Sequence, residues 1–279
     1  MSITAGIDVG STYTKTVLLD ADNKIVARHQ LNTGFKLAEV AEKCFQACLA
    51  EARLTSDDIA YIIATGYGRH QVAFKDLIVT DITASARGCH LLFPETRTVL
   101  DVGGQTMKAI RLEPDGKVKS FRQNDKCAAG TGAFLEKTAR YMGYETDDIG
   151  GLLDPSRDPA EISGVCAVFA ESEVINQLSL GTPPADIMQG AIESLTTRAV
   201  QLMKRVKAEP GHTLIGGIMR FGTMSRAVDS RIKDDIQLPG GGEDRALPQF
   251  VTALGAAWLA HHRLRKLAGE GSTPTPAAA

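Results

Sequence analysis

The chain has 279 residues, a formal net charge of −2 at pH 7 and 43% hydrophobic residues, which is typical of a globular protein long enough for two domains. So small a net charge with mixed signs argues against a nucleic-acid or anionic-membrane partner. The first residues lack a basic region followed by an apolar core, and no apolar run is long enough to span a membrane, so we expect a cytoplasmic protein in a reducing compartment.

The N-terminal stretch predicts a meander of three strands. Ile3–Ile7 is an apolar run, Thr14–Leu19 alternates between polar and apolar residues, and Ile25–Arg28 follows a turn rich in Asp and Asn. Flexible and polar residues surround the first turn: Asp8, Gly10, Ser11, Thr12 and Lys15. A helix is expected next at Leu37–Leu54, and a buried strand at Ile59–Ala64.

The pattern of the first hairpin returns at Leu100–Leu112. Asp101 corresponds to Asp8, Gly103 to Gly10 and Lys108 to Lys15. The alternation of apolar residues beyond the turn also agrees between the two copies. A single Asp-x-Gly more often makes only a tight turn, but its recurrence on matched strands indicates an internal repeat. The sequence therefore predicts a duplicated fold in which two such hairpins face each other.

Two facing hairpins of this kind suit a nucleoside triphosphate with its magnesium ion. Glycine lets backbone N–H groups approach phosphate closely, and neighbouring polar side chains add donors. The expected phosphate contacts are Gly10, Ser11, Thr12 and Lys15 in the first copy and Gly103, Gly104 and Gln105 in the second. An aspartate at a strand end can hold a hydrated divalent cation or orient water. We expect Asp8 to hold the hydrated metal and Asp101 to orient the attacking water.

The five cysteines of the chain are Cys44, Cys48, Cys89, Cys127 and Cys166. Cys127 and Cys166 each stand at or just before a helical run, where the free N–H groups of the first turn favour a thiolate. Two exposed thiolates are half the ligand set of a four-iron cluster or a structural zinc site, so pairing across a two-fold axis would complete it. The alternative is that each is an ordinary buried hydrophobe. Cys44 and Cys48 are expected in the core, and no role is assigned to Cys89.

The C-terminal part predicts a long amphipathic helix at Ile187–Val206 and a strand at Thr213–Ile215. This strand ends in Gly216 and Gly217. Because glycine has no side chain, a flat ring could lie directly against the backbone there. A final helix is expected at Leu247–Ala268, with small residues that permit close packing. We divide the chain into three parts. Residues 1–95 form an N-terminal lobe with the first hairpin, and residues 96–268 form a C-terminal lobe with the second hairpin, the cysteines Cys127 and Cys166 and the paired glycines. Residues 269–279 are a low-complexity tail that we expect to be disordered.

The nucleotide motifs resemble those of the actin, Hsp70 and sugar-kinase superfamily. Asp8-Val9-Gly10-Ser11 and Asp101-Val102-Gly103-Gly104 match its two phosphate motifs, and Gly216-Gly217 matches its adenosine motif. This resemblance implies an α/β fold of the duplicated, RNase H-like, two-lobed ATPase type.

Three further motifs are more specific: ATGYGR at 64–69, NDKCAAGTG at 124–132 and VFAESEVI at 168–175. Together they resemble the activator ATPases of 2-hydroxyacyl-CoA dehydratases and the ATPase subunits of benzoyl-CoA reductases. In that family, two protomers share one [4Fe-4S] cluster at their interface, and ATP drives an electron from it into a partner that reduces a CoA thioester. Cys127 and Cys166 stand at the positions of the two cysteines that each protomer supplies.

The same resemblance implies the partners of the chain. They are a second, identical or similar ATPase subunit, an iron-sulfur reductase or dehydratase component, and ferredoxin or flavodoxin as electron donor. The residues Ile218–Phe221 are larger and less polar than in the dehydratase activators, and the connection Arg231–Arg245 is unusually polar. We interpret both features as favouring the ATPase subunit of a benzoyl-CoA reductase, with a dehydratase activator as the alternative.

Two other classes share the nucleotide motifs. A redox-silent, actin-like assembly protein would have no use for two thiols at helix starts. A sugar or acetate kinase would need a substrate cleft with its own base, and the sequence offers no matching motif. We therefore expect an ATPase coupled to electron transfer.

Overall fold

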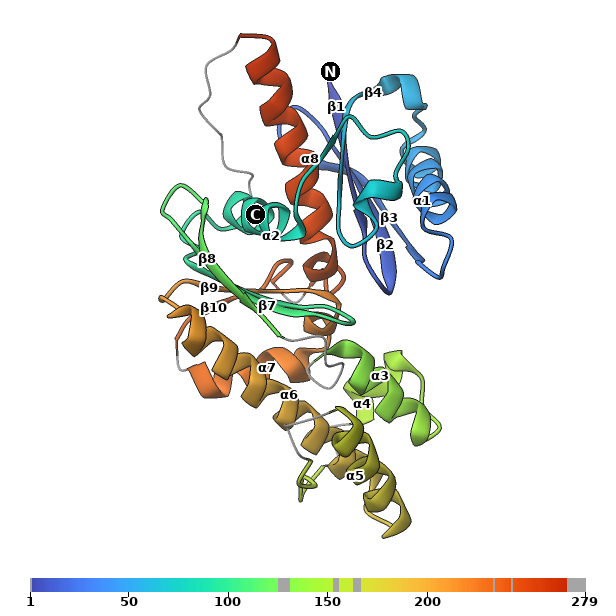
Figure 1. The fold of residues 1–279 in the computed structure, drawn as a ribbon, viewed down its shortest axis with the longest axis vertical. Coiled ribbons are helices and arrows are strands. Elements are labelled where there is room, and N and C mark those ends of the chain that lie inside the picture. Colours follow the sequence, from blue (N-terminus) through green and yellow to red (C-terminus); the bar gives the residue numbers. More distant parts are fainter. Residues whose placement is uncertain are drawn as a thin grey trace. The chain divides into compact units, whose positions relative to one another are not determined.

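The computed structural model describes residues 2–124, 131–152, 156–162, 167–232, 234–241 and 243–269 (Figure 1). Cys127 and Cys166 lie outside these ranges. The described strands form two five-stranded sheets, in the orders β3-β2-β1-β4-β5 and β10-β9-β6-β7-β8. Read from the meander outwards, the two sheets have the same order, so the repeat seen in the sequence is also a repeat of topology.

The first sheet is built around the N-terminal meander. Its strands are β1 (Ile3–Val9), β2 (Tyr13–Leu19), β3 (Ile25–Asn32), β4 (Ile59–Thr65) and β5 (Leu77–Ile78). Because β1 runs antiparallel to β2 and parallel to β4, the strand ends that carry Asp8 and Thr65 meet at one edge of the sheet. Apolar residues of β1 and β2 pack against helix α1 (Leu37–Ala52), where Phe45 stacks on Phe74 with ring centroids 5.0 Å apart.

The second sheet repeats this plan. Its strands are β6 (Thr98–Val102), β7 (Met107–Leu112), β8 (Val118–Gln123), β9 (His212–Ile215) and β10 (Ile236–Gln237). β6 pairs antiparallel with β7 and parallel with β9. β6 and β9 are buried along their whole length, as expected for parallel strands that are covered on both faces.

The helices account for most of the remaining described chain. They are α1 (Leu37–Ala52), α2 (Asp81–Leu92), α3 (Gly132–Tyr141), α4 (Ile149–Leu152), α5 (Ala167–Ser179), α6 (Pro184–Val206), α7 (Gly222–Ile232) and α8 (Leu247–Leu267), with short 3-10 turns at Ser56–Asp58, Arg69–Gln71, Thr146–Asp148 and Gly217–Arg220. None of the helices in the described part of the chain is both long and apolar enough to cross a membrane. The helices and strands expected from periodicity are confirmed, with end points shifted by a few residues.

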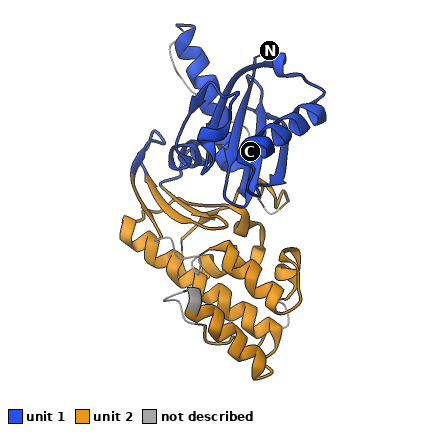
Figure 2. Cartoon of the chain, turned by 45° about the vertical axis from the view of Figure 1, so that its right-hand side comes forward, with its two compact units in different colours: residues 1–97, 112–119, 249–279 blue, residues 98–111, 120–248 orange. Residues whose placement is uncertain are grey.

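The chain folds into two compact units (Figure 2). The first comprises residues 1–97, 112–119 and 249–279, and the second comprises residues 98–111 and 120–248. Nearly all of α8 therefore belongs to the same unit as the N-terminal sheet. The boundary that we expect between residues 95 and 96 follows the internal repeat instead. That the two lobes meet at this boundary remains a proposal.

Close approach of backbones fixes α8 to the N-terminal sheet within the first unit. A Cβ on Gly6 of β1 would clash with the carbonyl oxygen of Ala253 in α8. One turn further along, the hydroxyl of Thr4 donates to the carbonyl oxygen of Ala257 at 2.9 Å. The small residues of α8 thus permit the close packing that the sequence predicted.

Candidate functional site

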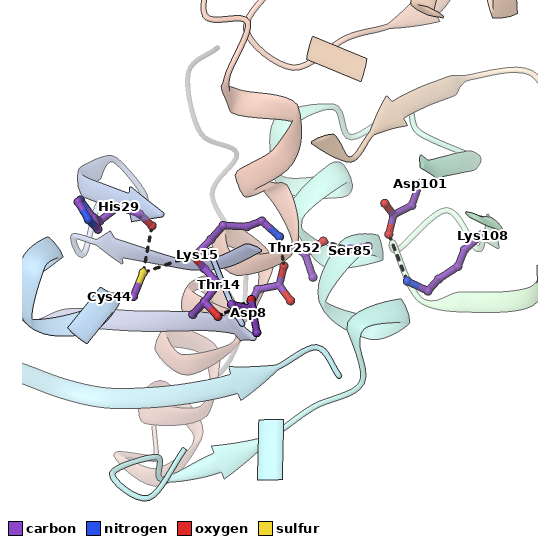
Figure 3. A network of polar contacts seen from close by, with 10 residues as sticks. Asp8, Thr14, Lys15, His29, Cys44, Ser85, Asp101, Lys108 and Thr252 are labelled. Atoms are coloured by element: carbon purple, nitrogen blue, oxygen red, sulfur yellow. Dashed lines mark hydrogen bonds and ion pairs between the residues drawn. The ribbon is translucent and has the colours of Figure 1, made fainter. Parts of the chain in front are cut away.

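The first predicted phosphate hairpin carries a buried pair of opposite charges. Asp8, near the end of β1, lies directly opposite Lys15 of β2, and Lys15 Nζ donates to Asp8 Oδ2 at 3.0 Å (Figure 3). The turn between the strands is closed by the Gly10 N–H, which donates to the carbonyl oxygen of Tyr13 at 3.1 Å. The lysine therefore fixes the orientation of the aspartate at the end of the strand.

The second hairpin reproduces this arrangement in the other unit. Asp101 of β6 lies opposite Lys108 of β7, with Nζ and Oδ2 3.5 Å apart (Figure 3). The Gly103 N–H closes the turn by donating to the carbonyl oxygen of Thr106 at 2.9 Å. Both aspartates are 7% exposed, so the two copies agree in register, turn and burial.

A glycine turn from the neighbouring parallel strand covers each aspartate. Gly66 after β4 has φ +85°, and a Cβ there would clash with Asp8 Oδ1. Gly216 after β9 has φ +99°, and a Cβ there would lie 2.8 Å from Asp101 Oδ1. A side chain at either glycine would displace the carboxylate.

The Gly66 turn was overlooked as part of the site. The sequence assigned Gly216 and Gly217 to the nucleotide, but gave no role to the equivalent turn in the first half. The signal was present, because Thr65-Gly66 and Ile215-Gly216 both end a buried strand parallel to an aspartate-bearing strand.

The second hairpin is bonded directly to the start of α3. Gly132 N–H donates to the carbonyl oxygen of Gly103 at 3.0 Å, and Ala133 N–H donates to that of Gly104 at 2.7 Å. Gly132 also packs against the turn after β9, since a Cβ on it would lie 2.6 Å from Ile218 Cδ1. The phosphate hairpin, the turn after β9 and the first turn of α3 are thus one packed assembly within the second unit.

The other predicted nucleotide contacts lie on the same turns. Ser11 and Thr12 are half-buried, and the carbonyl oxygen of Thr12 accepts a hydrogen bond from the Thr33 N–H at 2.9 Å. Gln105 is exposed on the second hairpin, and Gly217 begins the 3-10 turn. The first-copy residues belong to one compact unit and the second-copy residues to the other, so a single nucleotide held by both copies remains a prediction.

The three described cysteines are core residues. Cys44 and Cys48 of α1 and Cys89 of α2 are fully buried, which confirms the expectation for the first two. Burial raises the pKa of the Cys44 thiol and, together with the nearby charge of Glu51, raises the pKa of Cys48 to about 12. Such thiols stay protonated and are poor metal ligands.

No metal site is formed by the described residues themselves. Among them, no three or more His, Cys, Asp or Glu side chains gather closely enough to hold a metal ion. The candidate ligands Cys127 and Cys166 fall outside the described ranges, and in the sequence they precede α3 and α5. Their role as cluster ligands remains a prediction.

The turn after β9 ends in a fixed charge. Arg220 Nη2 donates to Asp147 Oδ1 at 2.6 Å, and its guanidinium carbon lies 4.8 Å from the centre of the Phe221 ring. The larger residues that the sequence shows at 218–221 therefore do more than fill space. They include a cation, Arg220, that Asp147 holds in place.

Comparison with known proteins places the chain among ATPases. The family model described as "BadF/BadG/BcrA/BcrD ATPase family" matches residues 5–260. The activator of lactoyl-CoA dehydratase from Anaerotignum propionicum is 40% identical over 266 residues, which cover 94% of this chain and 99% of that protein. One of the subunits of benzoyl-CoA reductase from Thauera aromatica is 35% identical, with 100% of both chains covered.

A solved structure agrees with the sequence comparisons. The activator of the 2-hydroxyisocaproyl-CoA dehydratase from Clostridium difficile with bound ADPNP matches with a TM-score of 0.88 and 33% identity, covering 98% of this chain and 99% of that one. The fold is therefore the two-lobed α/β fold of the actin, Hsp70 and sugar-kinase type.

Proposed function

Since the chain belongs to the BadF/BadG/BcrA/BcrD ATPase family, we propose that it uses ATP hydrolysis to drive low-potential electrons into a partner enzyme that acts on a CoA thioester. ATP hydrolysis itself follows from the family. The further step is electron transfer through a [4Fe-4S] cluster held by Cys127 and Cys166 and by the same cysteines of a second protomer. When bound, the cluster supplies a site that stores and releases one electron.

The observation that carries the proposal is the bonding between the second phosphate hairpin and the helix after Cys127. The carbonyl oxygens of Gly103 and Gly104 accept hydrogen bonds from the first two residues of α3. A change in the hairpin on binding or losing the terminal phosphate would therefore act on the helix that follows the cysteine segment. This link gives ATP hydrolysis a short physical route to the proposed ligand.

In the hydrolytic step, the two aspartates take different roles. We assign Asp8 to the water molecules bound to Mg²⁺, and Asp101 to the water that attacks the terminal phosphate. Lys15 and Lys108 hold the carboxylates in place through the ion pairs at 3.0 and 3.5 Å. The Gly10 and Gly103 N–H groups close their own turns, so the phosphates would be held by the other backbone N–H groups of these turns.

The partner belongs to one of two classes. The residues Ile218–Phe221 favour a benzoyl-CoA reductase, and one of the subunits of such an enzyme is 35% identical over the whole chain. A 2-hydroxyacyl-CoA dehydratase is supported equally, by the activator that is 40% identical. Both partners need an electron of low potential, for which ferredoxin or flavodoxin is the proposed source.

Anaerobic purification from the native host tests the proposal. We expect a brown protein with about four irons per two chains that passes electrons to its co-purified partner only when ATP is present. A partner that reduces an aromatic CoA thioester would identify a reductase, and one that dehydrates a 2-hydroxyacyl-CoA would identify a dehydratase. A colourless, iron-free ATPase from anaerobic cells would instead support the redox-silent assembly protein.

A further inference from the structure

A pocket of about 500 Å³ lies in the second unit, and its lining residues take no part in the sites described above. One side of it is a face of α6, on which Gly190 and Ser194 stand one helical turn apart. The segment 159–162, Glu173 of α5 and Arg231 of α7 line other sides. A pocket of this volume suits a small organic molecule.

The segment that lines the pocket is anchored to the start of α6. Asp186 Oδ1 accepts a hydrogen bond from the Ser156 hydroxyl at 2.8 Å. It also accepts from the N–H groups of Arg157 and Asp158, at 2.8 and 3.0 Å. The Ala160 N–H donates to the carbonyl oxygen of Asp186 at 3.0 Å. This wall of the pocket is therefore fixed within the protein itself.

Gly190 lets the same segment lie directly on α6. A Cβ on Gly190 would clash with the carbonyl oxygen of Ala160 and lie 3.2 Å from Ile162 Cγ1. Ile162 is buried and belongs to the hydrophobic core of the second unit. Because these walls are held together without a ligand, binding does not have to order them first.

The lining of the pocket is acidic. It carries three glutamates, Glu161, Glu173 and Glu193, and one arginine, Arg231. Arg231 Nη1 donates to the carbonyl oxygen of Glu193 at 3.2 Å, and Nη2 lies 3.9 Å from Glu193 Oε2. Since the arginine balances one glutamate, two negative charges remain in the lining. They favour a ligand with two positive charges.

A buried hydroxyl is a second, independent sign of a ligand. Ser194 is 7% exposed and lines the pocket, and its hydroxyl has no hydrogen-bond partner among the residues that the structure describes. A buried hydroxyl without a partner is unfavourable. A ligand that donates a hydrogen bond to Ser194 Oγ would remove this cost.

A bare metal ion does not match this lining. In the described ranges, no three or more His, Cys, Asp or Glu side chains gather closely enough to hold one. Apolar groups of Pro159, Ala160 and Ile162 also line the pocket, and an alkyl chain can cover them. Carboxylates, a free acceptor and an apolar wall together match an alkyl chain that carries an ammonium group at each end.

We propose that this pocket binds a linear aliphatic diamine. One ammonium group donates a hydrogen bond to the Ser194 hydroxyl, and the carboxylates of Glu161 and Glu173 attract the other. The alkyl chain lies on Ala160 and Ile162. All these residues belong to the second unit, so the inference does not depend on the proposed electron transfer.

Calorimetric titration of the full-length protein with 1,4-diaminobutane tests the inference. We expect saturation at about one diamine per chain, and an affinity roughly tenfold above that of butylamine, which lacks the second ammonium group. An equal concentration of Mg²⁺, which has the same charge, should not displace the diamine. Absence of saturable binding, or displacement by Mg²⁺, would overturn the inference.

Three variants locate the binding. Ser194→Ala should weaken diamine binding by about tenfold or more, and without diamine it should melt at the same temperature as the unchanged protein or higher, because an unpaired hydroxyl is removed. Glu161→Gln should weaken binding by about two- to fivefold, since an exposed charge contributes less. Glu243→Gln, at an exposed position of the same unit outside the pocket lining, is the matched control and should change neither value.

The variants also give results that would contradict the proposal. One is an unchanged affinity for the diamine in both Ser194→Ala and Glu161→Gln. Another is an equal loss of affinity in Glu243→Gln, which would show that the diamine only neutralises surface charge. A lower melting temperature of Ser194→Ala without diamine would show that the hydroxyl is already satisfied within the fold.

Discussion

Asp8 and Asp101 occupy such similar surroundings that their roles must be separated by experiment. Asp101→Asn should lower kcat for ATP hydrolysis by about 10²–10⁴-fold and leave KM nearly unchanged, because an amide orients the attacking water poorly. Asp8→Asn should instead raise the Mg²⁺ concentration required for half-maximal rate. Phosphate release, measured against ATP and against Mg²⁺, distinguishes the two. Full turnover in Asp101→Asn would refute its assignment.

The glycine turn over Asp8 predicts a second residue-scale effect. Gly66 and Gly34 both have positive φ, at +85° and +58°, but a Cβ on Gly34 would meet no atom within 4 Å. Gly34→Ala should therefore lower the free energy of unfolding by about 1 kcal/mol through backbone strain alone. Gly66→Ala should cost roughly 1–3 kcal/mol more and slow ATP hydrolysis, because it also displaces the Asp8 carboxylate. Equal losses in urea unfolding would contradict this account.

At the scale of elements, the start of α3 connects the nucleotide to the cysteine segment. Ala133→Pro deletes the N–H that donates to Gly104, in a first turn where a helix tolerates proline. We expect ATP hydrolysis to continue while ATP-dependent electron transfer to the partner falls by about tenfold or more, since one bond of about 1 kcal/mol and the fit of the first turn are lost. The two rates are measured side by side.

Ala38→Pro is the matched control for this variant. Ala38 is likewise the second residue of its helix, α1, in the first unit. The same local change there should leave both rates unaltered. If Ala133→Pro and Ala38→Pro behave alike, α3 does not transmit the nucleotide state.

The elements differ in how far the sequence could predict them. The two meanders were predictable because the second repeats the first residue by residue, and α6 because its apolar residues recur at helical spacing. Helices α2 and α7 were not predicted. Glycine, serine and threonine residues in each helix interrupt the regular spacing of apolar residues by which a helix is recognised in a sequence. Each helix is stabilised by packing within its own unit.

The candidate site was predictable to a similar extent. Aspartates and glycines at strand ends stand out in the sequence. The packing of the start of α3 against the turn after β9 does not, because it depends on how closely Gly132 approaches Ile218. The likeness of Thr65-Gly66 to Ile215-Gly216 is a signal for the turn that covers Asp8, but the strand pairing that brings Gly66 there joins residues far apart in the chain.

For the whole molecule, the iron content should follow the dimer. Two cysteines per chain cannot saturate four irons, so Cys127→Ser should remove the iron and weaken dimerisation. ATP binding should largely survive, because the nucleotide turns are built from other segments, while ATP-dependent electron transfer should be lost. Iron analysis and sedimentation of anaerobic protein measure these effects.

The buried cysteines serve as controls for this variant. Cys44→Ser and Cys48→Ser should keep the iron, since both thiols lie in the core of the first unit. Iron retained in Cys127→Ser or Cys166→Ser but lost in either control would show that the ligands were wrongly chosen.

The two units should also differ in acid stability. Burial lowers the pKa of His90, His261 and His262, all in the first unit. Below the usual histidine pKa of about 6.5, the unfolded chain therefore binds more protons than the folded chain. The free energy of unfolding of this unit consequently decreases as the pH is lowered. In the second unit, hydrogen bonds from the Arg157 and Asp158 N–H groups lower the pKa of Asp186, so that its contribution is lost only below about pH 4.

Fluorescence can follow the first unit alone, because the single tryptophan of the chain, Trp258, lies in α8. On lowering the pH from 7 to 5, the urea midpoint of Trp258 fluorescence should fall, and His261→Gln should reduce the fall. His70→Gln, at an exposed position, should not. A midpoint independent of pH over this range would contradict the burial argument.

The first unit is interrupted in the sequence, which constrains the order in which a ribosome can complete the molecule. Thr4 of β1 bonds to Ala257 of α8, 253 residues later. At about 5–20 residues per second, the N-terminal sheet waits roughly 10–50 s for the helix that covers it. All residues of the second unit precede Gln249, so this unit is fully synthesised before the helix that covers the N-terminal sheet. The half of the protein that is synthesised first is therefore the half that finishes folding last.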